Sequence, residues 1–177
     1  MAIFPDSKDW TWVLTEPCPE CGLVASEVPP EDIGERVRAD LPRWEAVLAK
    51  PAAEVRPAAG IGAGDIWSPV EYACHVRDVF ELFAERLRLM LDEDDPQVAN
   101  WDQDATAIED DYARQQASTV SAELVAAGTK TAAAFDAVAA DAWDRTGRRS
   151  NGSVFTTATL GQYFLHDVVH HLHDVDR

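Results

Sequence analysis

Histidines gather near the C-terminal end of this sequence in a pattern that suits metal binding. Four of the five histidines lie in the stretch 166–173, and the fifth is His75. A metal site built on helices takes two ligands four residues apart on one helix and at least one from a facing helix. The pairs with that spacing are His166 with His170 and Asp167 with His171.

Helical phase distinguishes the two pairs. With about 100° of rotation per residue, the apolar side chains near Val168 define one buried face. Those within about 60° of Val168 are Phe164, Leu165, Leu172 and Val175. On this wheel His171 lies about 60° and Asp167 about 100° from Val168, at the border of the buried face. We therefore expect the side chains of Asp167 and His171 to point into the protein. In contrast, His166, His170 and His173 lie about 140–160° away and should face solvent or a partner subunit.

His75 is the candidate ligand from a second helix. It stands beside an apolar stripe at helical spacing, formed by Tyr72, Val76, Val79 and Leu82. An inward carboxylate next to an inward imidazole is costly unless a cation or a proton is shared between them. We therefore predict that His75, Asp167 and His171 bind a divalent metal, with His166 and His170 as the alternative pair. Two imidazoles and one carboxylate suit Zn²⁺, Ni²⁺ or Fe²⁺.

A second interpretation needs no metal. A single inward histidine is often a hydrogen-bonded core residue, and histidine cations at a helix C-terminus interact well with the helix dipole.

The elements that would position these residues are four amphipathic helices. The first is expected at about 30–49, and the second begins at a capping box formed by Ser68 and Glu71 and ends near 92–96. The third is expected at 117–140, and the fourth runs from Thr156 or Thr157 to near the C-terminus. No segment shows a convincing strand pattern. The sequence therefore predicts an all-α four-helix bundle over residues 30–177, preceded by an irregular N-terminal arm over residues 1–29, in which Trp10 and Trp12 pack onto the bundle.

The arm carries the motif Cys18-Pro19-Glu20-Cys21-Gly22. Three interpretations stay open: a tight structural turn, a redox-active dithiol, and half of a zinc site whose other half is missing nearby. With Cys74 the cysteines number three, which fits a reducing compartment better than a disulfide framework.

Charge and hydropathy exclude several classes of function. Thirty-two acidic residues against 15 basic ones give a formal net charge of -17, which opposes binding to nucleic acids or anionic membranes. There is no apolar run of membrane-spanning length and no signal peptide at the N-terminus, so we expect a cytoplasmic protein.

Two motifs resemble a known family. The segment Trp67-Ser68-Pro69-Val70-Glu71-Tyr72-Ala73-Cys74-His75, followed by His166-Asp167-Val168-Val169-His170-His171-Leu172-His173-Asp174-Val175, is similar to the DinB/YfiT-like superfamily. That superfamily includes mycothiol-dependent maleylpyruvate isomerase and bacillithiol transferases. The resemblance implies a four-helix bundle with His75 as the first metal ligand and His171 as the last. The middle ligand falls on Asp167, where the family more often has His or Glu.

The resemblance also implies thiol chemistry. A low-molecular-weight thiol such as mycothiol would bind the metal as a thiolate and attack an electrophile, in an S-transferase or isomerase reaction. Arg145, Arg148 and Arg149 would hold the polar part of the thiol or a substrate carboxylate, unless they form an exposed basic loop. No general base stands out, although His170 and Asp174 are nearest. The rival is a non-catalytic binding or stress-response module whose metal is structural or absent. The outward histidines leave room for a homodimer surface.

Overall fold

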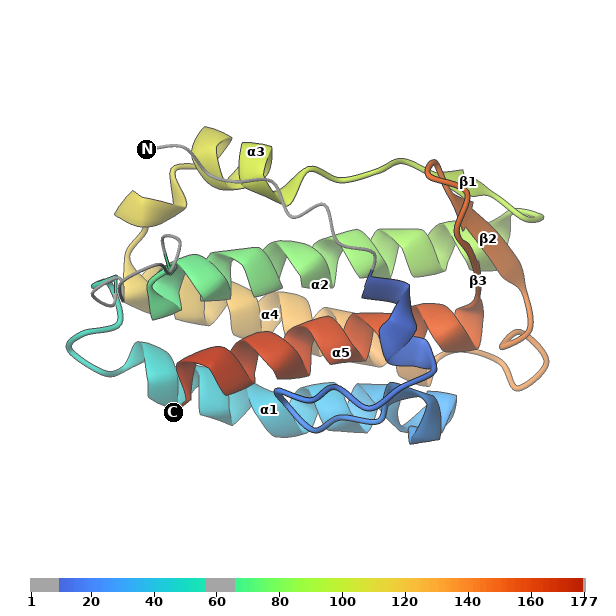
Figure 1. Ribbon diagram of the computed structural model, residues 1–177, viewed down its shortest axis with the longest axis horizontal. Coiled ribbons are helices and arrows are strands. Elements are labelled where there is room, and N and C mark those ends of the chain that lie inside the picture. Colours follow the sequence, from blue (N-terminus) through green and yellow to red (C-terminus); the bar gives the residue numbers. More distant parts are fainter. Residues whose placement is uncertain (1–9, 57–65, 177) are drawn as a thin grey trace.

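Four long helices run along one axis of the molecule and form a bundle (Figure 1). The computed structural model describes residues 10–56 and 66–176. The long helices are α1 (Ile33–Leu48), α2 (Pro69–Asp92), α4 (Ala117–Asp136) and α5 (Thr157–Val175). Around the bundle the packed neighbours are α1 with α4, α4 with α2, α2 with α5 and α5 with α1. The helices α1 and α2 are consecutive in the chain but diagonal in the bundle, so α2 faces α5 directly.

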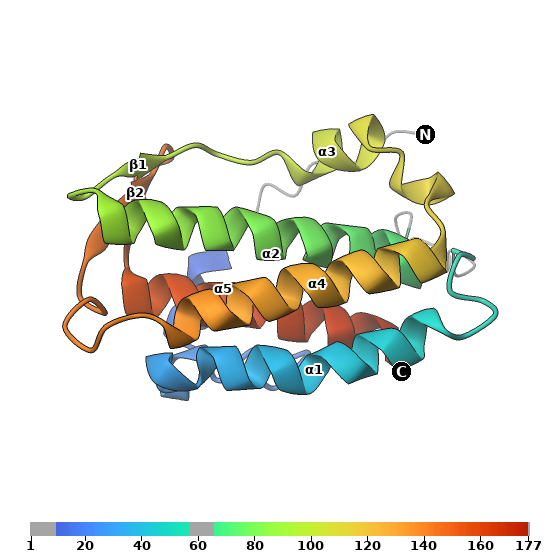
Figure 2. The same ribbon diagram turned by 180° about the vertical axis from the view of Figure 1, so that it is seen from behind.

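These helices confirm the all-α prediction, with small differences at their ends. A short 3₁₀ helix (Pro30–Asp32) precedes α1, and α4 ends at Asp136 rather than at 140. Seen from behind, α1 and α4 lie in front of α5 (Figure 2). No described helix has the length and apolar character needed to span a bilayer.

The core is built from aromatic and aliphatic side chains of all four helices. Phe164 of α5 stacks on Phe135 of α4 and packs against Phe80 of α2, and all three are buried. Gly161 permits this approach, because a Cβ at that position would stand 2.4 Å from Ile33 and 2.9 Å from Phe135. Helix α5 is thereby held tightly against its neighbours, with its polar edge facing α2 and the arm.

The loops contain structure that the sequence pattern did not predict. A three-stranded sheet joins β1 (Gln97–Val98), β2 (Thr146–Arg149) and β3 (Val154–Thr156), and α3 (Gln103–Glu109) follows β1. Strands of two to four residues are too short to show alternation, which is why the sequence showed no convincing strand pattern. The sheet pairs β1 with β2 in parallel, and α3 then packs against α2.

The described part of the N-terminal arm lies across α5 (Figure 1). Its first element is a 3₁₀ helix (Trp10–Leu14), and a second follows at Ala25–Glu27. The rings of Trp10 and Trp12 pack against His166 of α5, with centroids 6.1 and 6.4 Å away. The prediction that these tryptophans pack the arm onto the bundle is confirmed.

The start of α2 fixes the position of His75 along the bundle axis. Ser68 and Glu71 form the predicted capping box: the Ser68 hydroxyl accepts from the Glu71 amide, and Glu71 accepts from the Ser68 amide at 2.8 Å. Arg56 also donates to the buried Glu71 carboxylate. Burial acts to raise the pKa of Glu71, but the hydrogen bonds from Arg56 and Ser68 outweigh it and lower that pKa. One helical turn later comes His75.

We predict that Glu71→Gln lowers the free energy of unfolding by about 2 kcal/mol at pH 7, because it removes charged hydrogen bonds at a buried cap. A lowered folded-state pKa stabilises the chain fully above the ordinary value of 4.5, and this stabilisation is lost as pH falls through the folded-state pKa. The difference between wild type and variant should therefore shrink below pH 4.5. Denaturant unfolding at several pH values measures it, with the exposed Glu81→Gln as control. A difference that does not change with pH would contradict the assigned ion pair.

Candidate metal centre

Three side chains predicted to share a metal lie together between α2 and α5. His75 Nε2 stands 3.3 Å from Asp167 Oδ1, and His171 Nε2 stands 3.8 Å from the same oxygen. One ligand atom from each residue lies within 4.8 Å of the other two. With metal–ligand bonds of about 2.1 Å, ligand atoms of one ion are roughly 3.0–3.5 Å apart. The trio therefore has the spacing of a metal site after a small contraction.

The buried ligand atoms of His75 and Asp167 lack hydrogen bonds of good geometry. Within the described part of the chain, both ring nitrogens of His75 and the Oδ1 atom of Asp167 are buried without a hydrogen bond. Buried polar atoms are otherwise almost always paired. A cation among the three residues would satisfy His75 and Asp167 together, so these residues fit a bound divalent metal.

The charge and orientation of the ligands suit the same role. Burial acts to raise the pKa of Asp167, but its contact with His75 and the charges of His75 and His171 outweigh it and lower the pKa to about 2. Asp167 is thus a carboxylate at neutral pH. His171 Nδ1 lies 3.4 Å from Asp174 Oδ2, and an ionised carboxylate can only accept. In the neutral imidazole, Asp174 would hold the proton on Nδ1 and leave Nε2, the atom nearest Asp167, to bind a metal.

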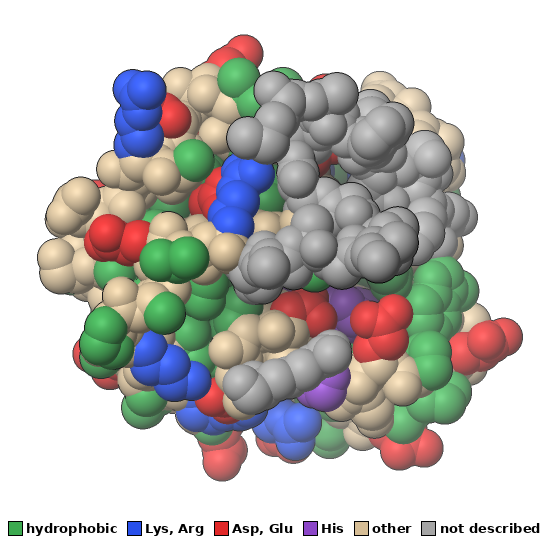
Figure 3. All heavy atoms as spheres, turned by 60° about the vertical axis from the view of Figure 1, so that its left-hand side comes forward, with side chains coloured by type: hydrophobic (Ala, Val, Ile, Leu, Met, Phe, Trp, Pro, Cys, Tyr) green, Lys and Arg blue, Asp and Glu red, His purple; other side chains and the backbone are tan. Residues whose placement is uncertain are grey.

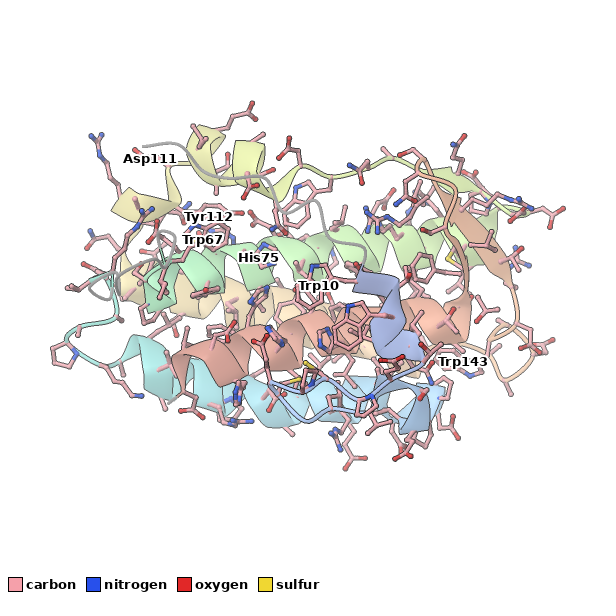
Figure 4. The ribbon with its side chains drawn as sticks, viewed as in Figure 1. Trp10, Trp67, His75, Asp111, Tyr112 and Trp143 are labelled. Carbon is pink, nitrogen blue, oxygen red and sulfur yellow. The ribbon has the colours of Figure 1, made fainter. Side chains whose placement is uncertain are left out.

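Aromatic rings surround the two imidazoles. Trp101 stacks on His75 with centroids 5.4 Å apart, and Trp67 lies 5.8 Å from His75 on another side. Tyr72 packs against His171 at 5.3 Å. Figure 4 shows Trp67 and His75 near the same end of α2, with Trp10 of the arm beside them over α5. From that end of the bundle, histidine side chains are visible among acidic ones (Figure 3).

Two of the cavities lined by described residues border Asp167. One, of about 120 Å³, is lined by Trp10, Gln103, Tyr163, His166, Asp167, His170 and His171. The other, of about 80 Å³, shares Gln103, Tyr163 and Asp167 and adds Trp101, Arg86 and Arg149. The candidate metal centre therefore has space beside it, partly lined by two guanidinium groups.

The three arginines predicted to bind thiol or substrate lie in different places. Arg149 lines the smaller cavity. Arg145 donates instead to the Met90 and Glu93 carbonyls at the end of α2, at 2.7 Å each. Arg148 pairs with Asp95 at 2.6 Å. Neither Arg145 nor Arg148 lines the two cavities beside Asp167, because Arg145 binds carbonyls at the end of α2 and Arg148 binds Asp95 in the turn that follows.

The outward orientation predicted for His166 and His170 is wrong. Both are buried, at 5% and 8% exposure, because the N-terminal arm covers that face of α5. They lie close to Cys18 and Cys21 of the arm rather than to His75. His173 is partly buried. The covered face removes the argument that these histidines form a homodimer surface.

Sequence reasoning missed several residues around the centre. Arg86 was not singled out, although it follows His75 by eleven residues, which is about three helical turns and returns to the same face. That spacing was a usable signal. Tyr163 precedes Asp167 by four residues, about one helical turn, which was also a usable signal. Trp101 and Gln103 had no such signal, since the sheet and α3 set their positions. Burial, and then the charge of Asp167, raise the pKa of Tyr163, so its hydroxyl stays protonated.

Comparisons with known proteins agree with this architecture. No curated protein matches the chain significantly. A solved structure, described as "YfiT from Bacillus subtilis is a probable metal-dependent hydrolase with an unusual four-helix bundle topology", has the same fold with a TM-score of 0.68. It is 17% identical, and the match covers 81% of this chain and 82% of that chain. The sequence model of the DinB superfamily matches residues 34–175, and the chain therefore belongs to the DinB superfamily.

Proposed function

We propose that this protein is a divalent-metal-dependent enzyme that acts on a small molecule, with His75, Asp167 and His171 as the metal ligands. The observation that carries the proposal is the convergence of these residues, with buried His75 and Asp167 atoms that have no hydrogen bond within the described residues. Zn²⁺, Ni²⁺ and Fe²⁺ all suit this set of ligands.

The chain's own groups have distinct parts in this proposal. A bound divalent cation lowers the pKa of a thiol or of water, so that a nucleophile is available at neutral pH. Asp174 orients His171, and the rings of Trp67 and Trp101 keep water from His75. Tyr163, which lines both cavities, holds a proton that it can donate to a leaving group or to a developing anion.

Two arginines beside the centre suggest that the substrate or the thiol carries an anionic group. Arg86 and Arg149 line the same cavity, and the Nε atom of each is buried without a hydrogen bond among the described residues. Burial and then the charge of Arg149 lower the pKa of Arg86 to about 10. Arg86 is buried and Arg149 is half-buried, and a carboxylate that accepts from both side chains would stabilise them together.

The reaction that we propose is thiol S-transfer or isomerisation with a mycothiol-type thiol. Its support is the resemblance of the two histidine motifs to mycothiol- and bacillithiol-using members of the superfamily, together with the space beside Asp167. The description of the structural relative as a probable hydrolase favours a second candidate, metal-dependent hydrolysis, which needs the same ligands but no thiol.

A non-catalytic bundle with a structural or absent metal is the rival from another class. A structural metal is closed by four protein ligands, whereas a catalytic one keeps a position open. Three candidate protein ligands gather here, beside a cavity of about 120 Å³. That arrangement supports catalysis.

We predict that His171→Ala lowers the metal content of the purified protein by about one equivalent, because two ligands cannot hold the ion. Elemental analysis after dialysis measures the loss. His173→Ala is the matched control, since it removes an imidazole two positions away that is outside the ligand trio. Equal metal content in wild type and His171→Ala would refute the assigned ligands.

We predict that Arg149→Ala raises KM for an electrophile bearing a carboxylate about tenfold or more, since a charged hydrogen bond contributes about 1.5–3 kcal/mol. The methyl ester of the same electrophile should show little change. Arg148→Ala is the control, because that arginine pairs with Asp95 outside both cavities. Equal effects of Arg149→Ala on acid and ester would argue against carboxylate recognition.

The thiol dependence separates the candidate reactions. Turnover of a reporter electrophile, measured with mycothiol, bacillithiol, glutathione or no thiol, should require a thiol and disappear in His171→Ala. Metal-dependent turnover of an ester or amide without thiol would favour hydrolysis. No metal-dependent turnover in either assay, with one equivalent of metal bound at the trio, would favour the non-catalytic bundle.

A further inference from the structure

We propose that Cys18, Cys21, His166 and His170 form a second metal site, a closed Cys₂His₂ site for Zn²⁺ that attaches the N-terminal arm to α5. The inference is independent of the proposed enzymatic function, since it uses none of the three residues assigned to the first centre. It also gives the cysteine motif the partners that are missing from its neighbourhood in the sequence.

The four residues meet although the chain separates the two pairs widely. One ligand atom from each lies within 4.8 Å of the other three. Cys18 Sγ and His170 Nδ1 are 3.5 Å apart, across a sequence separation of 152 residues. With Zn–S bonds of about 2.3 Å and Zn–N bonds of about 2.0 Å, tetrahedral ligand atoms are roughly 3.3–3.8 Å apart. Shifts of about 1 Å or less would close the site.

The cysteine pair lies in a turn of the kind that presents two thiolates to one ion. The Gly22 amide donates to the Cys18 carbonyl and the Cys18 amide to the Leu23 carbonyl, both at 2.9 Å. Gly22 has a φ of +74°, which a side chain would disfavour. Spacings of two residues between the cysteines and three between the histidines are those of structural zinc sites.

The histidine pair presents one buried ring nitrogen without a hydrogen bond and one beside the Cys18 sulfur. His166 Nε2 is buried with no partner among the described residues. His170 Nε2 lies 3.6 Å from a Glu20 carboxylate oxygen and 3.7 Å from one of Asp174. Such carboxylates commonly accept from the distal nitrogen of a metal-binding histidine, which leaves Nδ1, the atom near Cys18, for the metal.

The surroundings suit a structural metal rather than a catalytic one. Four protein ligands complete the tetrahedral coordination of Zn²⁺ and leave no position open for substrate. Trp10 packs over both histidines, with centroids 6.1 Å from His166 and 5.8 Å from His170. Binding replaces the two thiol protons by the ion, so neither an oxidant nor a reductant is needed.

The other interpretations of the cysteine motif explain less. A simple turn accounts for Gly22 but not for the buried, unpaired His166 Nε2 or for the gathering of both histidines at the sulfurs. A disulfide or redox dithiol would use Cys18 and Cys21 alone. Only a metal uses all four side chains at once.

The zinc site would also shape the cavity beside the first centre. Trp10 belongs to the arm that the cysteines anchor, and its ring lines the cavity of about 120 Å³ together with Asp167 and His171. The arm is thus a fixed wall of that cavity when Zn²⁺ is bound.

Cobalt substitution of the full chain tests the inference. The protein is stripped of metal under reducing conditions, reloaded with Co²⁺, and its absorption is recorded. Wild type should show thiolate-to-cobalt charge transfer and the intense visible bands of tetrahedral cobalt, and should bind two equivalents of Zn²⁺. The Cys18→Ser/Cys21→Ser variant should lose the charge-transfer band and one equivalent, whereas His171→Ala should keep the band. Cys74→Ser is the matched control, because Cys74 is buried in α2.

A second measurement uses the wild-type protein alone, so that its result does not depend on whether a variant folds. With Zn²⁺ bound, alkylation under native conditions should modify fewer than one thiol per chain. After chelation it should modify two, Cys18 and Cys21, as identified by peptide mapping. Cobalt without a charge-transfer band, or alkylation of the two cysteines at the same rate with and without Zn²⁺, would overturn the proposal.

Discussion

The charge balance around Asp167 is the constraint on which the rest of the site depends. Its carboxylate sits between two imidazoles, and its Oδ1 atom is buried without a hydrogen bond among the described residues. Burying a carboxylate oxygen without a partner is costly, and a positive charge nearby offsets that cost. A divalent cation supplies it while also pairing the His75 nitrogen. Two features of the fold bring the ligands together around Asp167. The capping box sets the position of His75 along the bundle axis, and the order of helices around the bundle places α2 against α5.

Helix α5 carries two ligand pairs offset by a single residue. The pair Asp167 and His171 faces α2, and the pair His166 and His170 faces the arm, because one residue rotates the helix by about 100°. Each pair meets partners from a different part of the chain: His75 in one case, Cys18 and Cys21 in the other. One helix can therefore serve a centre with space for a substrate and, on the adjoining face, a closed site that holds the covering segment in place.

Much of the fold followed from periodicity and capping, and the rest depended on contacts that a one-dimensional pattern does not contain. The capping box at Ser68 and the stripe around Val168 were sufficient to predict α2, α5 and the inward direction of Asp167 and His171. The same helical-wheel argument gave the wrong orientation for His166 and His170, because it assumes that the polar face of a helix is exposed to solvent. Here an irregular arm with two tryptophans covers that face. The short sheet escaped notice because its strands have only two to four residues, and because β1 pairs with β2 across about 50 residues of sequence. Arg149 of this sheet lines the smaller cavity, whereas Arg148 does not.

Diffraction at the metal absorption edge, from crystals of the protein grown with its native metal, tests the central claim most directly. The account predicts an anomalous peak within bonding distance of His75, Asp167 and His171, with an open coordination position toward Tyr163. A map without density at that point, with His75 donating a direct hydrogen bond to Asp167, would contradict it.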